Sequence, residues 1–172
     1  SGIYSGHNGF KKGGNSRIVA NVNFTTSNIN STSDGYGHGT HVAGIAAGNS
    51  TLWNGSYRGI ADDANIISVK VLDDQGLGQT SWLLNGLNWV LENKDTFNIR
   101  VVNLSLGTTA IDSYSNDPIC VKVKELAQAG IVVVAAAGNL GKDASGNEIY
   151  GRIHSPGNSP YAITVGASNS YG

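Results

Sequence analysis

Residues 131–137 (IVVVAAA) form the longest apolar run in the chain, and its length suits a strand rather than a membrane span. Strands that are apolar throughout are typical of parallel sheets, because the crossovers between parallel strands place helices over both faces. Three further strands are predicted at 64–72, 100–106 and 161–167. The run at 131–137 therefore predicts the central strand of a parallel sheet.

Two helices are predicted between these strands. Residues 80–92 carry apolar side chains at helical spacing, and residues 118–129 begin with a proline and are followed by a glycine. The order strand, helix, strand, helix, strand implies right-handed crossovers. We therefore expect an α/β fold of three layers, a mostly parallel sheet with helices on both faces.

A third helix is predicted over residues 38–47, with Gly48 as its stop. Its content of alanine, valine and isoleucine predicts a buried helix. Glycine inside a helix costs about 0.5–1 kcal/mol relative to alanine, so Gly44 predicts close packing against another element. The polar, glycine-rich residues 1–37 are expected to form loops that admit an edge strand at 18–24.

Composition restricts the possible partners. The chain has 172 residues, 40% hydrophobic and 13% charged, which predicts one folded domain over residues 1–172. The net charge of −1 argues against a nucleic-acid partner, which would require clustered lysine and arginine. No apolar run is long enough to predict a membrane partner. The single cysteine, Cys120, forms no internal disulfide and is expected to be a small buried side chain.

In parallel α/β sheets, active sites lie at the carboxyl ends of the strands. The strand at 100–106 runs into Ser105-Leu106-Gly107, and the strand at 131–137 runs into Gly138-Asn139. An asparagine in that position can present its side-chain amide to a developing oxyanion, a contact worth about 2.7–4 kcal/mol of transition-state stabilisation. A Gly-Asn pair is also typical of turns, so the residues alone leave both interpretations open for Asn139.

His38 stands where the third predicted helix begins, and there it can lean into a cleft while Gly39 leaves room for a substrate. A helix-entry histidine bonded to the backbone is the alternative. His38 and His41 also form an HxxH pair, but the HExxH spacing and its glutamate are absent, and Asp34 is the nearest further ligand. No metal site is therefore predicted, and His41 is expected to be a packed, hydrogen-bonded histidine.

A nucleotide site is excluded at the glycines of residues 35–39. No apolar strand leads into them, and their spacing does not meet GxGxxG.

Three segments resemble successive signature blocks of the subtilisin-like serine peptidases: GHGTHVAGIAAG (37–48), VVNLSLG (101–107) and VVVAAAGN (132–139). Weaker matches at 58–78 and 155–167 extend the resemblance over nearly the whole chain, and residues 94–139 are similar to bacterial members. The resemblance implies a serine-type endopeptidase that hydrolyses peptide bonds in proteins through a Ser-His-Asp triad.

The resemblance also implies a role for particular residues. His38 would be the general base, and Asn139 would donate to the oxyanion. Six further residues would bind the substrate: Ser105, Leu106, Gly107, Ala136, Ala137 and Gly138. The first three would pair with the substrate backbone in an extended manner, and the last three would line the pocket for the residue before the scissile bond.

The partner implied is therefore a protein or peptide. No cofactor is required, although structural calcium is common in the family. Relatives are usually secreted, and the sequence leaves location and oligomeric state open.

Two departures from the family pattern stand out. The family's catalytic aspartate lies immediately before Ser-Gly-Ile, the tripeptide with which this chain opens at Ser1, and no Gly-Thr-Ser block for the nucleophile occurs. The sequence also has no methionine. We therefore expect an internal piece of a catalytic domain, incomplete at both ends, which lacks the Asp and the Ser, is inactive in isolation and leaves apolar surface uncovered.

The alternative function is a non-catalytic peptide-binding module that retains the groove. The presence of both His38 and Asn139 disfavours it, since a binding module needs neither.

Overall fold

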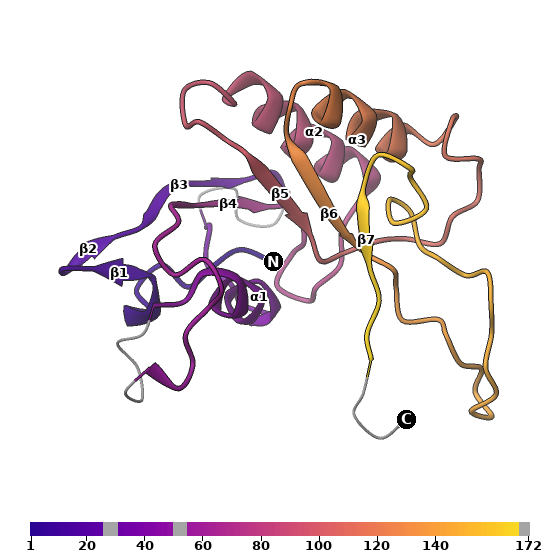
Figure 1. The fold of residues 1–172 in the computed structure, drawn as a ribbon, viewed down its shortest axis with the longest axis horizontal. Coiled ribbons are helices and arrows are strands. Elements are labelled where there is room, and N and C mark those ends of the chain that lie inside the picture. The colour runs from indigo at the N-terminus through magenta and orange to yellow at the C-terminus, as the bar shows by residue number, and fades with distance from the viewer. Residues whose placement is uncertain (26–30, 50–54, 169–172) are drawn as a thin grey trace. The chain divides into compact units, whose positions relative to one another are not determined.

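The computed structural model describes residues 1–25, 31–49 and 55–168, and the chain divides into two compact units, residues 1–86 and 87–172 (Figure 1). Among the helices of these described ranges, none combines the length and the apolar character that crossing a membrane requires.

The first unit contains a pair of parallel strands with a helix and a small hairpin. Its elements are η1 (Asn8–Phe10), β1 (Lys11–Lys12), β2 (Asn15–Ser16), β3 (Ile18–Asn23), α1 (His38–Ala47) and β4 (Ile66–Lys70). Strands β3 and β4 are parallel, and β1 and β2 pair antiparallel. The helix α2 (Thr80–Glu92) begins in this unit and ends in the next.

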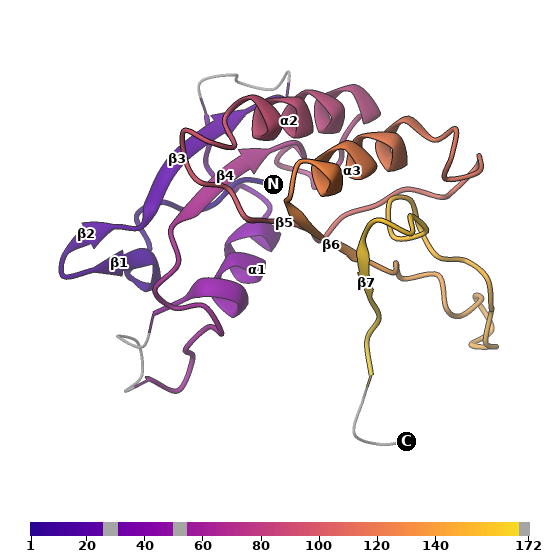
Figure 2. The ribbon, with the colours of Figure 1, turned by 45° about the horizontal axis from the view of Figure 1, so that its top comes forward.

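Successive side chains along β4 and the residue after it point to opposite faces of the strand pair. Val69 and Val71 point toward α2, where a Cβ added at Gly86 would lie 3.0 Å and 2.8 Å from their Cγ1 atoms. Gly86 therefore allows the helix to approach the strand closely. Lys70, between the two valines, points to the opposite face because side chains alternate along a strand. Helix α1 lies on that side of β3 and β4 (Figure 2).

The second unit contains three parallel strands in the order β5 (Val101–Leu104), β6 (Val132–Ala136), β7 (Ile163–Val165). Strand β6 is in the middle, which confirms the prediction made from its apolar sequence. Helix α3 (Pro118–Gln128) packs against β6, whose Val133 and Ala135 are buried.

The ends of α3 follow from its sequence. The Asp117 carboxylate accepts hydrogen bonds from the amides of Ile119 (2.8 Å) and Cys120 (3.2 Å), and Pro118 follows the cap. Gly130 adopts a φ of +83° just beyond the helix. Cys120 is buried as predicted, and burial raises the pKa of its thiol.

The face of this second sheet that carries Val101, Val132, Ile163 and Val165 is apolar and exposed. The register places Val101 beside Val132, and the exposed fractions of Ile163 and Val165 are 58% and 52%. The sequence predicts uncovered apolar surface, and among the described residues this face of the sheet is such a surface.

The predicted α/β class with parallel strands is confirmed, and so are the predicted bounds of α1 and α2. The strand predicted at 64–72 pairs with β3 in a sheet separate from that of β5, β6 and β7. The hairpin of β1 and β2 was not predicted within residues 1–37. The predicted burial of α1 is wrong for the described residues, since Ala47 is its only buried residue. A Cβ at Gly44 would meet nothing within 4 Å, so the close packing inferred there is wrong as well. A helix rich in alanine and glycine has no distinct apolar stripe from which burial could be judged.

Candidate active site

His38 is the first residue of α1, and its side chain is exposed. The preceding Gly37 has a φ of +88°, in the left-handed region that favours glycine. Gly37 offers no side chain to the free amides at the start of the helix, and Asp34 instead satisfies the amide of Thr40 together with that of Gly37 itself. Its carboxylate accepts from the amides of Gly37 (2.9 Å) and Thr40 (2.7 Å) and from the Thr40 hydroxyl (2.6 Å).

Asp34 is therefore the group that fixes where α1 starts. Burial by itself raises the pKa of its carboxyl, but the hydrogen bonds from Thr40, Ser1 and Gly37 outweigh burial and hold the pKa below its usual value. The positive end of the helix dipole also favours a carboxylate at this position.

Replacement of Asp34 by alanine is expected to lower the free energy of unfolding by about 1 kcal/mol at neutral pH, the usual effect of losing a helix cap. Because the pKa of Asp34 is lowered in the folded state, its contribution is present above the unfolded carboxyl pKa and is lost as the pH falls through the folded value. Urea unfolding at several pH values measures this.

Asp95→Ala is the matched control, because the Asp95 side chain is 95% exposed and pairs only with its neighbour Lys94. Equal losses for the two variants, or a difference that persists in strong acid, would contradict the assignment of Asp34 as a cap.

A buried lysine supports the loop that carries Asp34. The Lys70 side chain is 1% exposed, and its ammonium donates to the Ser33 carbonyl (2.6 Å) and pairs with the Asp74 carboxylate (2.5 Å). The Lys70 hydrogen bond and charge hold the pKa of Asp74 below its usual range. Asp74 in turn lies against Gly35, where an added Cβ would be 2.6 Å from its Cγ. The residues on both sides of Asp34 are thus tied to the segment that follows β4.

Gly39 has a different function from the one expected. A Cβ at this position would lie 2.1 Å from the carbonyl oxygen of Gly2, so the missing side chain makes room for the chain itself and not for a substrate. The Gly39 amide donates to the Ser1 hydroxyl (3.0 Å), and the Tyr4 amide donates to the Thr40 hydroxyl (2.9 Å). Residues 1–4 therefore stabilise the first turn of α1.

His41 is exposed, so its prediction as a packed histidine is wrong. Small neighbours on α1 leave its side chain uncovered. Within residues 1–25, 31–49 and 55–168, no three His, Cys, Asp or Glu side chains gather closely enough to hold a metal ion.

Asn139 lies in the second unit, three residues beyond Ala136, the last residue of β6, and its side chain is exposed. The preceding Gly138 has a φ of +106°, which turns the chain sharply after the strand. In the described part of the chain, no residue forms a hydrogen bond with the Asn139 side chain. Its amide is therefore available to a ligand.

The two segments predicted to bind substrate are joined by residues 154–157. The His154 amide donates to the Ala137 carbonyl (2.9 Å), and Ser155 exchanges two backbone hydrogen bonds of 2.9 Å with Thr108. The His154 ring lies against Gly107 and Gly138. The structure thus brings Ser105–Gly107 and Ala136–Gly138 to a common neighbour, His154.

His154 was not identified from the sequence. No motif marks it, because its position depends on backbone pairing between segments far apart in the chain. Asp34 was considered only as a metal ligand, although an acidic residue shortly before a predicted helix is a recognised cap signal.

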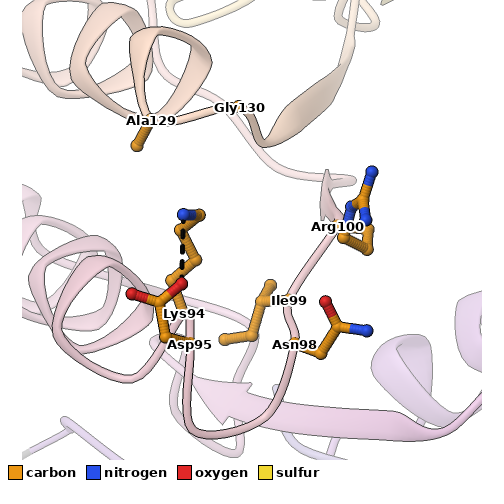
Figure 3. A pocket seen from close by; sticks show the side chains of 7 residues that line it. All are labelled: Lys94, Asp95, Asn98, Ile99, Arg100, Ala129 and Gly130. Carbon is orange, nitrogen blue, oxygen red and sulfur yellow. Dashed lines mark hydrogen bonds and ion pairs between the residues drawn. The ribbon is translucent and has the colours of Figure 1, made fainter.

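The second unit also contains a cavity lined by none of the predicted site residues. Lys94, Asp95, Asn98, Ile99, Arg100, Ala129 and Gly130 line it (Figure 3). It lies where β5 and β6 begin, and the Lys94 ammonium is 3.2 Å from the Asp95 carboxylate within it. Ligands of parallel sheets bind at the opposite, carboxyl ends of the strands, so this cavity is not our candidate site.

Comparison with known proteins gives one consistent result. The sequence profile of the subtilase family matches residues 1–172. Serine protease AprX of Bacillus subtilis (strain 168) is 42% identical over 139 residues, which cover 78% of this chain and 30% of that protein. Subtilisin E of Bacillus subtilis (strain 168) is 39% identical over 158 residues, which cover 89% of this chain and 36% of that protein.

A comparison with solved structures gives a match of the same kind. The crystal structure of a cold adapted subtilisin-like serine proteinase has a TM-score of 0.71 and 34% identity, and the match covers 98% of this chain and 52% of that chain. The chain therefore spans about a third of the length of these two curated relatives and about half of this solved structure.

Proposed function

This chain belongs to the subtilase family, and from that premise we propose that it forms part of the catalytic domain of a serine endopeptidase acting on proteins or peptides. The observation that carries the proposal is His38, which stands exposed at the start of α1 inside the sequence GHGTHVAG. Asp34 and Thr40 fix this end of the helix, so the imidazole projects from a firmly positioned backbone.

His38 is proposed as the general base. Its imidazole would take the proton of the serine hydroxyl as that oxygen attacks the peptide carbonyl, and would then give the proton to the leaving amine. Exposure of the His38 side chain supports this role, since a proton carrier must reach both the nucleophile and the substrate.

Asn139 is proposed as the oxyanion donor. Its amide lies just beyond the carboxyl end of β6, where parallel sheets bind their ligands, and is exposed. Ser105, Leu106 and Gly107 would pair with the substrate backbone, and Ala136, Ala137 and Gly138 would line the pocket for the residue before the scissile bond. Their common neighbour His154 supports the assignment of both segments to one pocket.

The nucleophilic serine and the triad aspartate are proposed to lie outside these 172 residues. The sequence contains no Gly-Thr-Ser block, and the relatives are about three times as long as the part they share with this chain. A polypeptide of these 172 residues alone is therefore expected to be inactive.

Labelling with a serine-directed fluorophosphonate tests the proposal. The protein as its gene encodes it should react stoichiometrically and cleave peptides, whereas the 172-residue polypeptide should not react. Asn139→Ala should reduce kcat by about 10²–10³-fold and slow labelling, because the phosphonyl oxygen uses the same donor as the oxyanion. Asn147→Ala is the control, since Asn147 bonds only within its own turn, to Asp143.

A gene product that binds peptides but neither reacts nor cleaves would favour the peptide-binding module instead. Stoichiometric labelling of the 172-residue polypeptide would contradict the proposed location of the serine.

A further inference from the structure

The ring of His154 stands between the two segments assigned to substrate binding. A Cβ built on Gly138 would lie 2.6 Å from the ring Cγ, and one built on Gly107 would lie 3.1 Å from the His154 Cβ and 3.5 Å from Nδ1. A side chain at Gly138 would therefore displace the imidazole, and one at Gly107 would press on the Ser155 carbonyl oxygen, 2.9 Å away, and on the His154 Cβ. Gly138 thus creates the space that the ring occupies, and Gly107 borders it.

The backbone holds this ring in place from both sides. The His154 amide donates to the Ala137 carbonyl next to Gly138, and Ser155 is fully buried and paired with Thr108 next to Gly107. Gly157 continues the close packing, since a Cβ there would lie 2.5 Å from the Ala136 carbonyl oxygen. The imidazole thus has a defined position relative to both segments.

One atom of this ring has no partner. Nε2 of His154 is buried and makes no hydrogen bond with any described residue. Among the described residues of the second unit, it is the only buried side-chain nitrogen or oxygen without a hydrogen-bond partner. Buried polar atoms in proteins nearly always have a partner, so an unsatisfied one requires an explanation. A ligand oxygen that reaches the Nε2 edge of the ring would supply the missing acceptor.

We propose that His154 sets the preference for the residue before the scissile bond and favours side chains that end in an oxygen acceptor, glutamate and glutamine. This inference rests on the proposed function, because it assigns a substrate to the same pocket. The Nε2 proton would be donated to the carboxylate or carboxamide oxygen of the substrate side chain. Large aromatic side chains would be disfavoured, since the imidazole occupies the space between Gly107 and Gly138 that they need.

Four fluorogenic peptides that differ only in the residue before the scissile bond, glutamate, glutamine, leucine or phenylalanine, provide the test on the protein as its gene encodes it. The wild type should cleave the glutamate and glutamine peptides with the higher kcat/KM. His154→Ala should reduce the glutamate-to-leucine ratio of kcat/KM by about 10- to 100-fold, the usual effect of losing a hydrogen bond to a charged group. It should also raise the relative rate on phenylalanine.

The ratio within one variant is independent of how much enzyme is folded, so partial misfolding of His154→Ala does not obscure the result. His154→Gln keeps an N–H donor and should retain part of the preference for glutamate and glutamine. His7→Ala is the control histidine, because His7 caps η1 in the other unit and should leave every ratio unchanged.

The possible outcomes distinguish the inference about His154 from the proposed endopeptidase function. Cleavage of all four peptides with the same ratios in wild type and His154→Ala, or a wild type that prefers leucine or phenylalanine, would overturn the inference alone. A gene product that cleaves none of them and does not react with a fluorophosphonate would overturn the proposed function, and the inference with it. A preference for glutamate without one for glutamine would show that the charge, and not the oxygen acceptor alone, is recognised.

Discussion

His38→Ala is expected to reduce kcat/KM for peptide hydrolysis by about 10⁴-fold or more, the largest effect of any single substitution in this chain. Without the imidazole no group can take the proton from the serine, and the residual rate reflects binding and oxyanion stabilisation alone. Stability should change little, because the His38 side chain is exposed and the end of α1 is fixed by Asp34. Steady-state kinetics and thermal unfolding of the gene product measure the two effects.

His41→Ala is the matched control for this experiment. His41 lies three residues further along the same helix, and its side chain is exposed as well. Hydrolysis by this variant should remain within a few-fold of the wild type. Similar losses for His38→Ala and His41→Ala, together with a stoichiometric metal that both variants lose, would contradict the general-base role and support a metal site at the HxxH pair.

Arg17→Met is expected to destabilise the first unit by about 2–5 kcal/mol, because each buried carbonyl left without a hydrogen bond costs about 1–3 kcal/mol. The Arg17 residue is 4% exposed, and its guanidinium donates to three carbonyls: those of Ala64 (2.7 Å), Gly9 (3.0 Å) and Ala47 (2.6 Å). Methionine has a similar apolar stem but no donor, so the Ala64 and Ala47 carbonyls would lose their partner. The Gly9 carbonyl would keep only the hydrogen bond from the Asn49 amide. Urea unfolding of the gene product measures the loss.

The contact with Ala47 explains why a cation suits this buried position. Ala47 is the last residue of α1, and the carbonyl end of a helix carries partial negative charge. Arg17 thus connects the end of α1 with η1 and with the segment that leads into β4. A lysine at 17 would keep the charge but reach fewer of these carbonyls, so Arg17→Lys should give an intermediate loss.

Arg58→Met is the control for Arg17→Met. The Arg58 side chain is 61% exposed and pairs with Asp62 four residues on, at 2.7 Å. Exposed ion pairs contribute about 0–1 kcal/mol, so this variant should be nearly as stable as the wild type. Equal losses for the two variants would show that the three carbonyls do not need Arg17.

Local patterns in the sequence were sufficient to predict the secondary structure around the candidate site. Pro118 and Gly130 bracket α3, and the apolar run at 131–137 predicts the central position of β6, because strand burial and helix ends depend on residues close together in the chain. The GHGTHVAG block also predicts His38 as the first residue of a helix, as observed. Burial of α1 was mispredicted, since alanine and glycine give no stripe that marks a covered face.

Only the folded chain decides which groups surround these elements. Arg17 and Lys70 are charged residues of a kind usually found at the surface, yet both are buried. Carbonyls from distant segments converge on Arg17, and the distant Ser33 carbonyl accepts from Lys70. His154 lies beside Gly107 and Gly138 because backbone pairing carries residues 154–155 between two strand ends. Hydrogen bonds across such sequence separations leave no periodic pattern. The sequence therefore specifies the elements and the family, while the packed structure determines which side chains fix the start of α1 and which one lies beside Gly107 and Gly138.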